Sequence, residues 1–247
     1  MSLESTIDEF QGITLAQMDG VKLMNRTDRK YWFSSEQLTE LLAAISSDYY
    51  IMEIGGERNL PYSTTYYDTL NNEMFANHHR GKLNRYKIRR RNYVSTQTSF
   101  LEVKFKSNKG RTVKVRRVSD YNTLGFDVED QLFIGKNTPY ECDQLHRVLR
   151  SDFRRLMLVG RSMNERCTID SELHFVSSAG ELSLDRMVIV EVKSEGRSHS
   201  KIVEALDRMR IKSSGFSKYC VGRSLTDSEL KQNRFKRQHR EIERKLR

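Results

Sequence analysis

Lysine and arginine recur at every second position in several segments of the chain, and this spacing could bind a chain of phosphates. In residues 84–93 the alternate positions hold Arg85, Lys87, Arg89 and Arg91. Successive side chains of a β-strand point to opposite faces, so these four cations would share one face. Four further segments also set a charged face against an apolar one: 100–106 (Glu102, Lys104, Lys106), 111–117 (Lys114, Arg116), 166–172 (Arg166, Asp170) and 187–193 (Glu191, Lys193).

The simplest interpretation of any one such strand is a sheet whose polar face lies in water. Against it stands the repetition, because like charges placed side by side on a sheet are destabilising unless an anion lies among them. A closed antiparallel barrel with helices over its apolar outside would turn the charged faces into a lumen. The ligand of that lumen would be a polyanion, because Lys and Arg are suited to phosphate oxygens. In such a barrel Arg89 and Lys193 would face water-filled space.

The elements that must position these cations follow from hydrophobic periodicity. We expect an α+β chain with a β-rich stretch at 62–117, strands near 154–159, 166–175 and 187–193, and no internal repeat. Helices are expected at 34–46, 140–149 and 200–209, and residues 1–20 should form a short helix or amphipathic lead-in. We assign residues 1–224 to one domain and residues 225–247 to a basic C-terminal helix or tail.

Composition narrows the class of protein. The 247 residues include 43 Lys and Arg against 33 Asp and Glu, but eight of the basic residues lie between Lys231 and Arg247. High net charge alone therefore does not argue for nucleic acid. No apolar run reaches the roughly 20 residues of a membrane span, and the acidic N-terminus is unlike a signal peptide. Three scattered cysteines indicate reduced thiols in a cytoplasmic protein.

The strands also carry an ordered set of motifs that resembles a known family. They are Asn25-Arg26-Thr27-Asp28-Arg29-Lys30-Tyr31-Trp32, Ser63-Thr64-Thr65-Tyr66-Tyr67-Asp68, Lys87-Ile88-Arg89, Glu102-Val103-Lys104, Gly110-Arg111-Thr112-Val113-Lys114, Arg154, Arg166, Glu191-Val192-Lys193 and Ser217-Lys218-Tyr219. In order and spacing they resemble the catalytic domain of the vacuolar transporter chaperone (VTC) polyphosphate polymerases. Those enzymes belong to the triphosphate tunnel, or CYTH-like, superfamily. The resemblance runs from about Asn25 to Val221.

This resemblance implies an eight-stranded antiparallel β tunnel barrel with helices packed outside. It implies transfer of the ATP γ-phosphate to a growing polyphosphate chain with Mn²⁺ or Mg²⁺, commonly manganese. Glu191 would be the metal carboxylate, with Glu102 or Asp170 as the alternatives. The phosphate-cradling positions would be Lys30, Lys87, Arg89, Lys104, Lys114, Arg154, Arg166, Lys193 and Lys218, of which Lys87, Arg89, Lys104, Arg154 and Arg166 would also bind the nucleotide.

Two other functions stay open beside the polymerase. The wider superfamily opens with Glu-x-Glu-x-Lys, whereas residues 26–30 here offer only Asp28 as an acid. Hydrolases of that superfamily use several carboxylates, which makes a triphosphatase the second choice. A non-catalytic polyanion-binding module, for example for RNA, would interleave aromatic residues with the basic ones, and these faces carry almost only Lys and Arg. The expected partners are thus ATP, phosphate and polyphosphate, without nucleic acid, and the oligomeric state is left open.

Two further features have an ordinary explanation and a functional one. His78-His79 could bind a metal, but a polar surface loop without a third ligand is the default. Trp32 could stack on adenine, although an aromatic residue at a strand end more often serves packing.

Overall fold

A computed structural model describes residues 2–19, 26–123, 125–195 and 199–246 of the chain. Its helices are α1 (Leu3–Asp8), α2 (Leu15–Asp19), η1 (Ser35–Gln37), α3 (Leu38–Ala43), α4 (Glu73–His79), α5 (Val128–Asn137), η2 (Cys142–Gln144), α6 (Lys201–Arg208), α7 (Lys218–Thr226) and α8 (Lys236–Leu246). In the described part of the chain, none of these helices has the length and apolar character needed to cross a bilayer.

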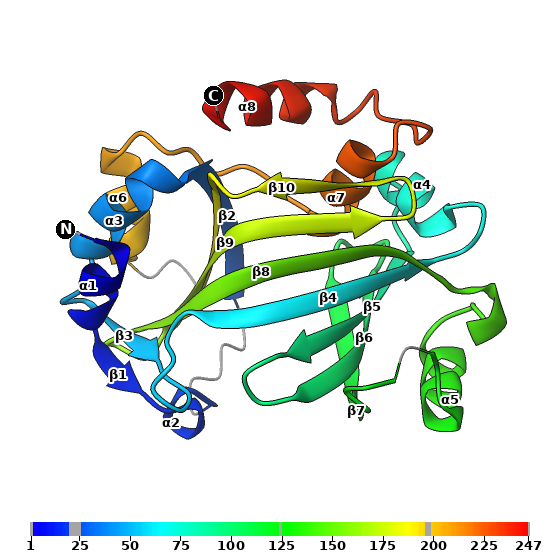
Figure 1. Cartoon of the computed structure of the whole chain (residues 1–247), viewed down its shortest axis with the longest axis horizontal. Helices are drawn as coiled ribbons and strands as arrows, with labels where there is room; N and C mark the ends of the chain where they lie inside the picture. Colours follow the sequence, from blue (N-terminus) through cyan, green and yellow to red (C-terminus); the bar gives the residue numbers. More distant parts are fainter. Residues whose placement is uncertain (1, 20–25, 124, 196–198, 247) are drawn as a thin grey trace.

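One antiparallel sheet carries the fold. Its main path runs in the order β2 (Arg26–Ser34), β11 (Met187–Glu195), β9 (Glu165–Ser177), β8 (His146–Gly160), β4 (Leu60–Asp68), β5 (Arg85–Tyr93), β6 (Thr98–Lys106) and β7 (Thr112–Ser119). Figure 1 shows β8, β9 and β4 crossing the view, with β2 standing nearly upright on one side and β7 on the other, and the hairpin of β5 and β6 bending beneath β4. The sheet is therefore strongly curved and has a concave and a convex face.

Three short strands extend the sheet away from this path. β1 (Gln11–Ile13) pairs in parallel with β3 (Tyr49–Met52), β3 pairs with β8, and β10 (Gly180–Leu184) pairs with β9. The path itself ends at β2 on one side and at β7 on the other. At β2 the backbone N–H of Ser214 donates to the Lys30 carbonyl oxygen over 2.8 Å, so the segment between α6 and α7 runs along that strand.

The alternating apolar residues of the strands pack against helices on the convex face. Beneath α3 and α6 lies a cluster that includes Val188, Val190 and Val192 of β11 with Leu41 and Ile202 of the helices. A second cluster beneath α5 joins Ile88, Leu101, Val103 and Ile134. Burying these side chains on one face leaves their charged neighbours on the other, because the side-chain period of a strand is two.

Helix α7 departs from the expected arrangement, because it packs against the concave face. Its Tyr219, Cys220 and Val221 belong to the same buried cluster as Trp32 of β2 and Phe175 of β9. The ring of Tyr219 stacks on Tyr66 at 5.2 Å between centroids. Helix α7 thus fills one part of the hollow with apolar side chains and leaves the remainder to the charged ones.

The expected helix at 140–149 is wrong. Those residues form only the short η2, and β8 begins at His146 because it pairs with β4 from Asp68 onwards. The helix lies earlier, as α5, where the Asp127 side chain caps its first turn by accepting from the Asp130 N–H over 2.6 Å. Pairing between strands outweighed local periodicity here.

The fit of α7 inside the sheet predicts a large effect of one small substitution. A Cβ added at Gly222 would lie 2.6 Å from Phe175 Cδ1 and 2.8 Å from Leu149 Cδ2, so Gly222→Ala must displace core side chains. We expect a loss of about 1–3 kcal/mol in the free energy of unfolding, measured by thermal or urea denaturation.

Gly135→Ala is the matched control, because Gly135 lies in helix α5 with nothing within 4 Å of the added Cβ. It should leave stability unchanged or raise it by about 0.5–1 kcal/mol. Equal melting temperatures for the two variants would contradict the packing described for α7.

Candidate functional site

The concave face gathers most of the basic residues that the sequence pattern selected. In the strand register, Lys87 of β5, Lys104 of β6 and Lys114 of β7 stand side by side. On the other side of the hollow, Arg166 of β9 pairs with Lys193 of β11, and Glu191 of β11 pairs with Lys30 of β2. Strands far apart in the sequence therefore bring their charged faces to one place.

A cavity of about 280 Å³ opens into this hollow. Its charged wall is formed by Arg91, Arg155, Arg166 and Lys193, and Tyr62, Tyr93 and Met157 are among its other lining residues. The Tyr62 and Tyr93 rings lie 5.0 Å apart between centroids. The cavity thus combines cations with a smaller aromatic wall.

Two carboxylates on the concave face are fully engaged by cations. Glu102 is completely buried, accepts from Arg89 over 2.6 Å and also pairs with Lys114. Asp170 accepts from Arg155 over 2.5 and 2.8 Å and also pairs with Lys218. Burial alone would raise the pKa of both acids. The adjacent cations lower it by a larger amount, so each pKa lies well below its usual value. Both are thus occupied as internal counter-ions.

Glu191 is less tightly held than those two acids. Its nearest cations, Lys30 and Lys193, lie 4.0 Å from its carboxylate oxygens, and its side chain is 24% exposed. Burial raises its pKa, but Lys30, Lys193 and Arg155 outweigh burial and lower it to about 2. Glu191 is therefore ionised and keeps oxygen atoms available for a cation such as Mn²⁺ or Mg²⁺.

No cluster of three or more Asp, Glu, His or Cys side chains suited to a metal occurs among the described residues. A metal at Glu191 would therefore take its other ligands from phosphate oxygens and water, as Mg²⁺ commonly does. His78 and His79 lie at the end of helix α4 rather than in a loop, and His79 is buried. Trp32 is 1% exposed and packs 6.3 Å from the Phe216 ring.

Several lysines on this face have a lowered pKa, because their surroundings disfavour the charged ammonium form. Proximity to Arg89, then burial and Arg91, lower the pKa of Lys104 to about 6. Burial lowers the pKa of Lys218 to about 7 despite its pairing with Asp170. The pKa of Lys87 is also lowered, mainly by burial. The lowered pKa of Lys104 thus reports neighbouring positive charge, whereas those of Lys87 and Lys218 report mainly burial.

The N-terminus of α7 supplies two of these contacts. Ser217 caps the helix by accepting from the Cys220 N–H, and its hydroxyl also accepts from Lys87 Nζ over 2.9 Å. Lys218 follows it and lies 3.7 Å above the Phe153 ring centroid. The buried Asp68 accepts from the Tyr219 hydroxyl and from the Met74 and Phe75 N–H groups, which fixes the start of α7.

The structure does not bring Arg154 to this cluster. Its side chain lies on the convex face of β8 and donates to Glu57 over 3.2 Å. Arg155 takes the concave position instead, because it alternates along β8 with Phe153 and Met157, which also face the hollow. The motif located the right strand, but β8 buries apolar side chains on both of its faces at this point, so the alternation in the sequence does not show which arginine points inward.

Three other residues complete the comparison with the sequence. Arg89 was expected to face water-filled space, but it is only 9% exposed and holds Glu102. Arg91 and Arg155 line the cavity and were not selected from the sequence, although Arg91 shares the alternation of Lys87 and Arg89. The other expected phosphate-binding residues all lie on the concave side: Lys30, Lys87, Lys104, Lys114, Arg166, Lys193 and Lys218.

The chain matches the VTC domain family over residues 25–226. It belongs to the VTC domain family. The match covers every strand on the main path of the sheet and ends with α7. The search of curated protein sequences gave no significant match.

Solved structures share the fold at low sequence identity. A candidate adenylyl cyclase from Hippeastrum, described as having a dominant triphosphatase activity, aligns with a TM-score of 0.51 and 13% identity over 81% of this chain and 96% of its own. A candidate adenylate cyclase from Bacillus halodurans aligns at 14% identity over 78% and 96% of the two chains, with a TM-score of 0.48. The chain thus shares its α+β tunnel fold with the Hippeastrum protein.

The depressed lysine pKa values predict that binding a polyanion takes up protons. At pH 8 the Lys104 amine, with a pKa of about 6, is mostly neutral, and adjacent phosphate charge would raise that pKa and protonate it. Calorimetric titration with tripolyphosphate in buffers of different ionisation enthalpy measures the uptake.

Lys104→Gln provides the comparison, because it removes that one group and leaves the ligand's own titration unchanged. We expect it to lower proton uptake at pH 8 by up to about one proton per site. Identical uptake by the variant and the wild-type protein would show that Lys104 is not neutral in the free state.

Proposed function

We propose that this VTC domain is a polyphosphate polymerase that transfers the γ-phosphate of ATP onto a growing inorganic polyphosphate chain. The observation that carries the proposal is the uncompensated positive charge of the concave face. Glu102 and Asp170 are occupied by internal ion pairs, yet the neighbouring charge of Arg89 still lowers the pKa of Lys104. An anion with many charges would relieve this repulsion.

The arrangement suits phosphoryl transfer because that reaction depends mainly on positioning and charge neutralisation. Lysines at successive positions of β5, β6 and β7 can hold one segment of a phosphate chain, and Arg155, Arg166 and Lys193 can hold another. Ser217 and Lys218 at the start of α7 add donors beside Lys87. Cations on both sides of the hollow can thus bind a donor triphosphate and an acceptor chain.

Glu191 is the residue that would hold Mn²⁺ or Mg²⁺. Such an ion neutralises charge on phosphate oxygens and orients them when it is bound. Lys30 and Lys193 lie on either side of the Glu191 carboxylate, so they keep it ionised and bring cations next to the phosphates. A single carboxylate can supply one metal ligand, and phosphate oxygens and water would supply the others.

A triphosphatase is the second candidate, because a protein of the same fold from Hippeastrum is described with that activity. Hydrolysis needs an activated water molecule, for which several carboxylates are usually assembled. Here two carboxylates of the concave face, Glu102 and Asp170, are engaged by arginine and lysine. This engagement favours transfer to a phosphate chain over transfer to water.

The deciding experiment incubates the purified protein with ATP and Mn²⁺ and separates the products on a polyphosphate-stained gel. A ladder of polyphosphate with stoichiometric ADP supports the polymerase. Release of orthophosphate from ATP or tripolyphosphate without any ladder would support the triphosphatase instead.

Substitution of the two neighbouring arginines of β8 should affect polyphosphate synthesis very differently. Arg155→Gln removes a cavity cation and should reduce polyphosphate synthesis by about tenfold to a hundredfold, since a charge-assisted contact is worth about 1.5–3 kcal/mol. Arg154→Gln removes a cation of the convex face and should stay within about twofold of wild type.

Thermal melts of both arginine variants control for folding, because Arg155 also pairs with Asp170. If Arg154→Gln were the impaired variant and Arg155→Gln the active one, the assignment of the two faces of β8 would be reversed.

Substitution of the proposed metal carboxylate gives a separate test. Glu191→Gln should abolish most metal-dependent synthesis while binding of tripolyphosphate without metal is retained or strengthened, because a negative charge has been removed from a cationic site. Synthesis rates over a manganese titration, with binding by calorimetry, measure the two effects. Unchanged synthesis with the same manganese requirement would assign the metal to another group.

A further inference from the structure

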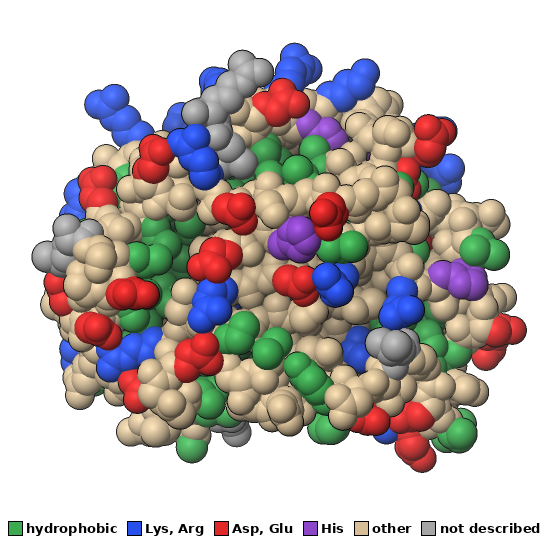
Figure 2. Space-filling view, viewed as in Figure 1, with side chains coloured by type: hydrophobic (Ala, Val, Ile, Leu, Met, Phe, Trp, Pro, Cys, Tyr) green, Lys and Arg blue, Asp and Glu red, His purple; other side chains and the backbone are tan. Residues whose placement is uncertain are grey.

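Helix α8 presents a second basic surface, outside the cavity. Its sequence, Lys236–Leu246, contains five Lys or Arg residues and two Glu. Lys236, Arg237, Arg240 and Arg244 are exposed and share one side of the helix, which we call the α8 face. Figure 2 shows Lys and Arg side chains projecting from the upper rim of the molecule, where Figure 1 places α8.

The opposite side of α8 is anchored to the body, so the α8 face has a fixed orientation. Ile242 is 4% exposed and joins the cluster that contains Trp32. Lys245 Nζ lies 4.1 Å above the Trp32 ring centroid and donates to the Trp32 carbonyl oxygen over 3.3 Å. Gln238 donates to the Gly215 carbonyl oxygen over 2.9 Å.

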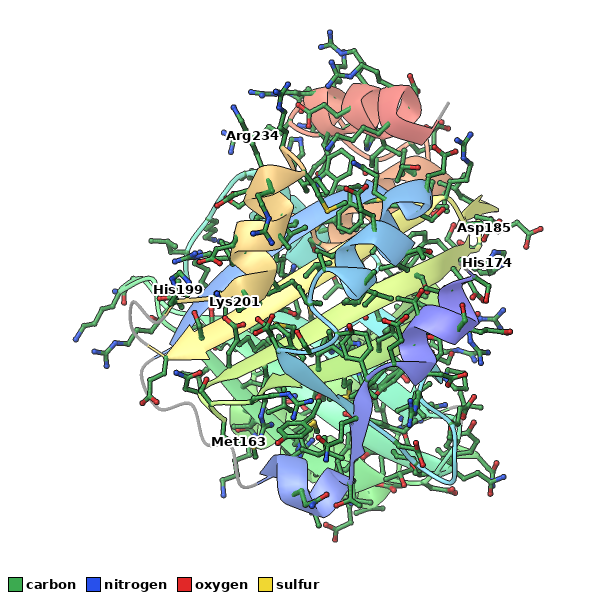
Figure 3. The ribbon with its side chains drawn as sticks, turned by 90° about the vertical axis from the view of Figure 1, so that its left-hand side faces the viewer. Met163, His174, Asp185, His199, Lys201 and Arg234 are labelled. Carbon is green, nitrogen blue, oxygen red and sulfur yellow. The ribbon has the colours of Figure 1, made fainter. Side chains whose placement is uncertain are left out.

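The segment between α6 and α7 connects the α8 face to the cavity side of the sheet. It contacts α8 through Gly215 and the edge of β2 through Ser214, which bonds to Lys30. The same segment carries two exposed cations, Arg210 and Lys212. Arg234, labelled near the top of Figure 3, precedes α8 and lies against α4, where its backbone N–H donates to His79 Nε2 over 3.4 Å. The Lys30 edge of the concave face and α8 are therefore joined by one short segment that itself carries exposed cations.

The chemistry of this surface selects its ligand. Its carboxylates are Glu241, which accepts from Arg237 over 2.9 Å, and Glu243. Among the described residues, none of the large exposed apolar side chains lies on α8 or between α6 and α7. A helix that enters a bilayer exposes an apolar face, and a surface that binds RNA offers aromatic rings for stacking. The surface therefore fits an anion with neither acyl chains nor bases.

We propose that the α8 face is a second binding surface for inorganic polyphosphate, which holds the part of a long chain that lies beyond the cavity. This inference rests on the proposed function, because it takes the product of that reaction as the ligand. An α-helix of 11 residues spans about 16 Å, so α8 can contact several successive phosphates. The binding is electrostatic and should weaken steeply with salt.

The test compares the binding of tripolyphosphate and long-chain polyphosphate to the full chain at several salt concentrations. The wild-type protein should bind the long chain more tightly by at least about tenfold at low salt, with a steeper salt dependence. Neutralising the α8 face with Lys236→Gln, Arg237→Gln, Arg240→Gln and Arg244→Gln should abolish this advantage. Tripolyphosphate binding and the initial rate of synthesis from ATP should stay unchanged in that variant.

A control variant removes equal charge from exposed positions elsewhere: Lys82→Gln, Lys109→Gln, Lys136→Gln and Arg147→Gln. It should keep the preference for the long chain. Equal losses in both variants would reduce the effect to net charge and overturn the proposal, as would full long-chain affinity in the α8-face variant.

The same set of measurements separates this inference from the proposed function. If the wild-type protein makes no polyphosphate but loses its long-chain preference only in the α8-face variant, the polymerase fails and the binding surface stands. If synthesis proceeds and chain length does not affect binding, the surface fails and the polymerase stands. Salt-sensitive binding to phosphatidylserine vesicles that depends on the α8 face, without any chain-length effect, would assign the surface to lipid and overturn the proposal.

Discussion

Repulsion among lysines and arginines on the concave face is the constraint on which the rest of the site depends. Strand pairing places Lys87, Lys104 and Lys114 in one row, where burial and neighbouring positive charge together lower the pKa of all three. Two buried acids make the row tolerable, Glu102 against Arg89 and Lys114, and Asp170 against Arg155 and Lys218. Removing either acid would leave buried cations without a counter-ion, which is strongly destabilising.

The apolar half of each strand supports this charged half. On the convex face, α3, α5 and α6 cover the alternating Val, Leu and Ile side chains and hold the curvature of the sheet. On the concave face, α7 supplies apolar packing at one part and delivers Ser217 and Lys218 to the charged part. Asp68 links α7 to α4, because it accepts hydrogen bonds from the Tyr219 hydroxyl and from the first turn of α4. Packing and ligand-binding geometry are therefore set by the same helix.

Much of this arrangement could be predicted from the sequence, because a period of two fixes which residues of a strand share a face. That period alone predicts that one face of each strand carries the basic side chains of Lys87, Arg89, Lys104, Lys114 and Lys193. The choice between Arg154 and Arg155 is not visible in the sequence, because β8 buries apolar side chains on both faces and only its packing shows which face is concave. The position of α7 inside the curve depends on the match between Gly222 and the Phe175 and Leu149 side chains. Both features come from tertiary contacts that no local pattern encodes.

The lowered pKa of Lys104 has a consequence for the stability of the protein as well as for its chemistry. A fold that stores repulsion is least stable when empty, and any polyanion that binds only the folded state stabilises it by mass action. At a ligand concentration 100 times the dissociation constant this gain is about 2.7 kcal/mol, which is a large share of the stability of an ordinary domain. Cellular phosphate supply would then set not only how fast the protein works but also how much of it survives proteolysis.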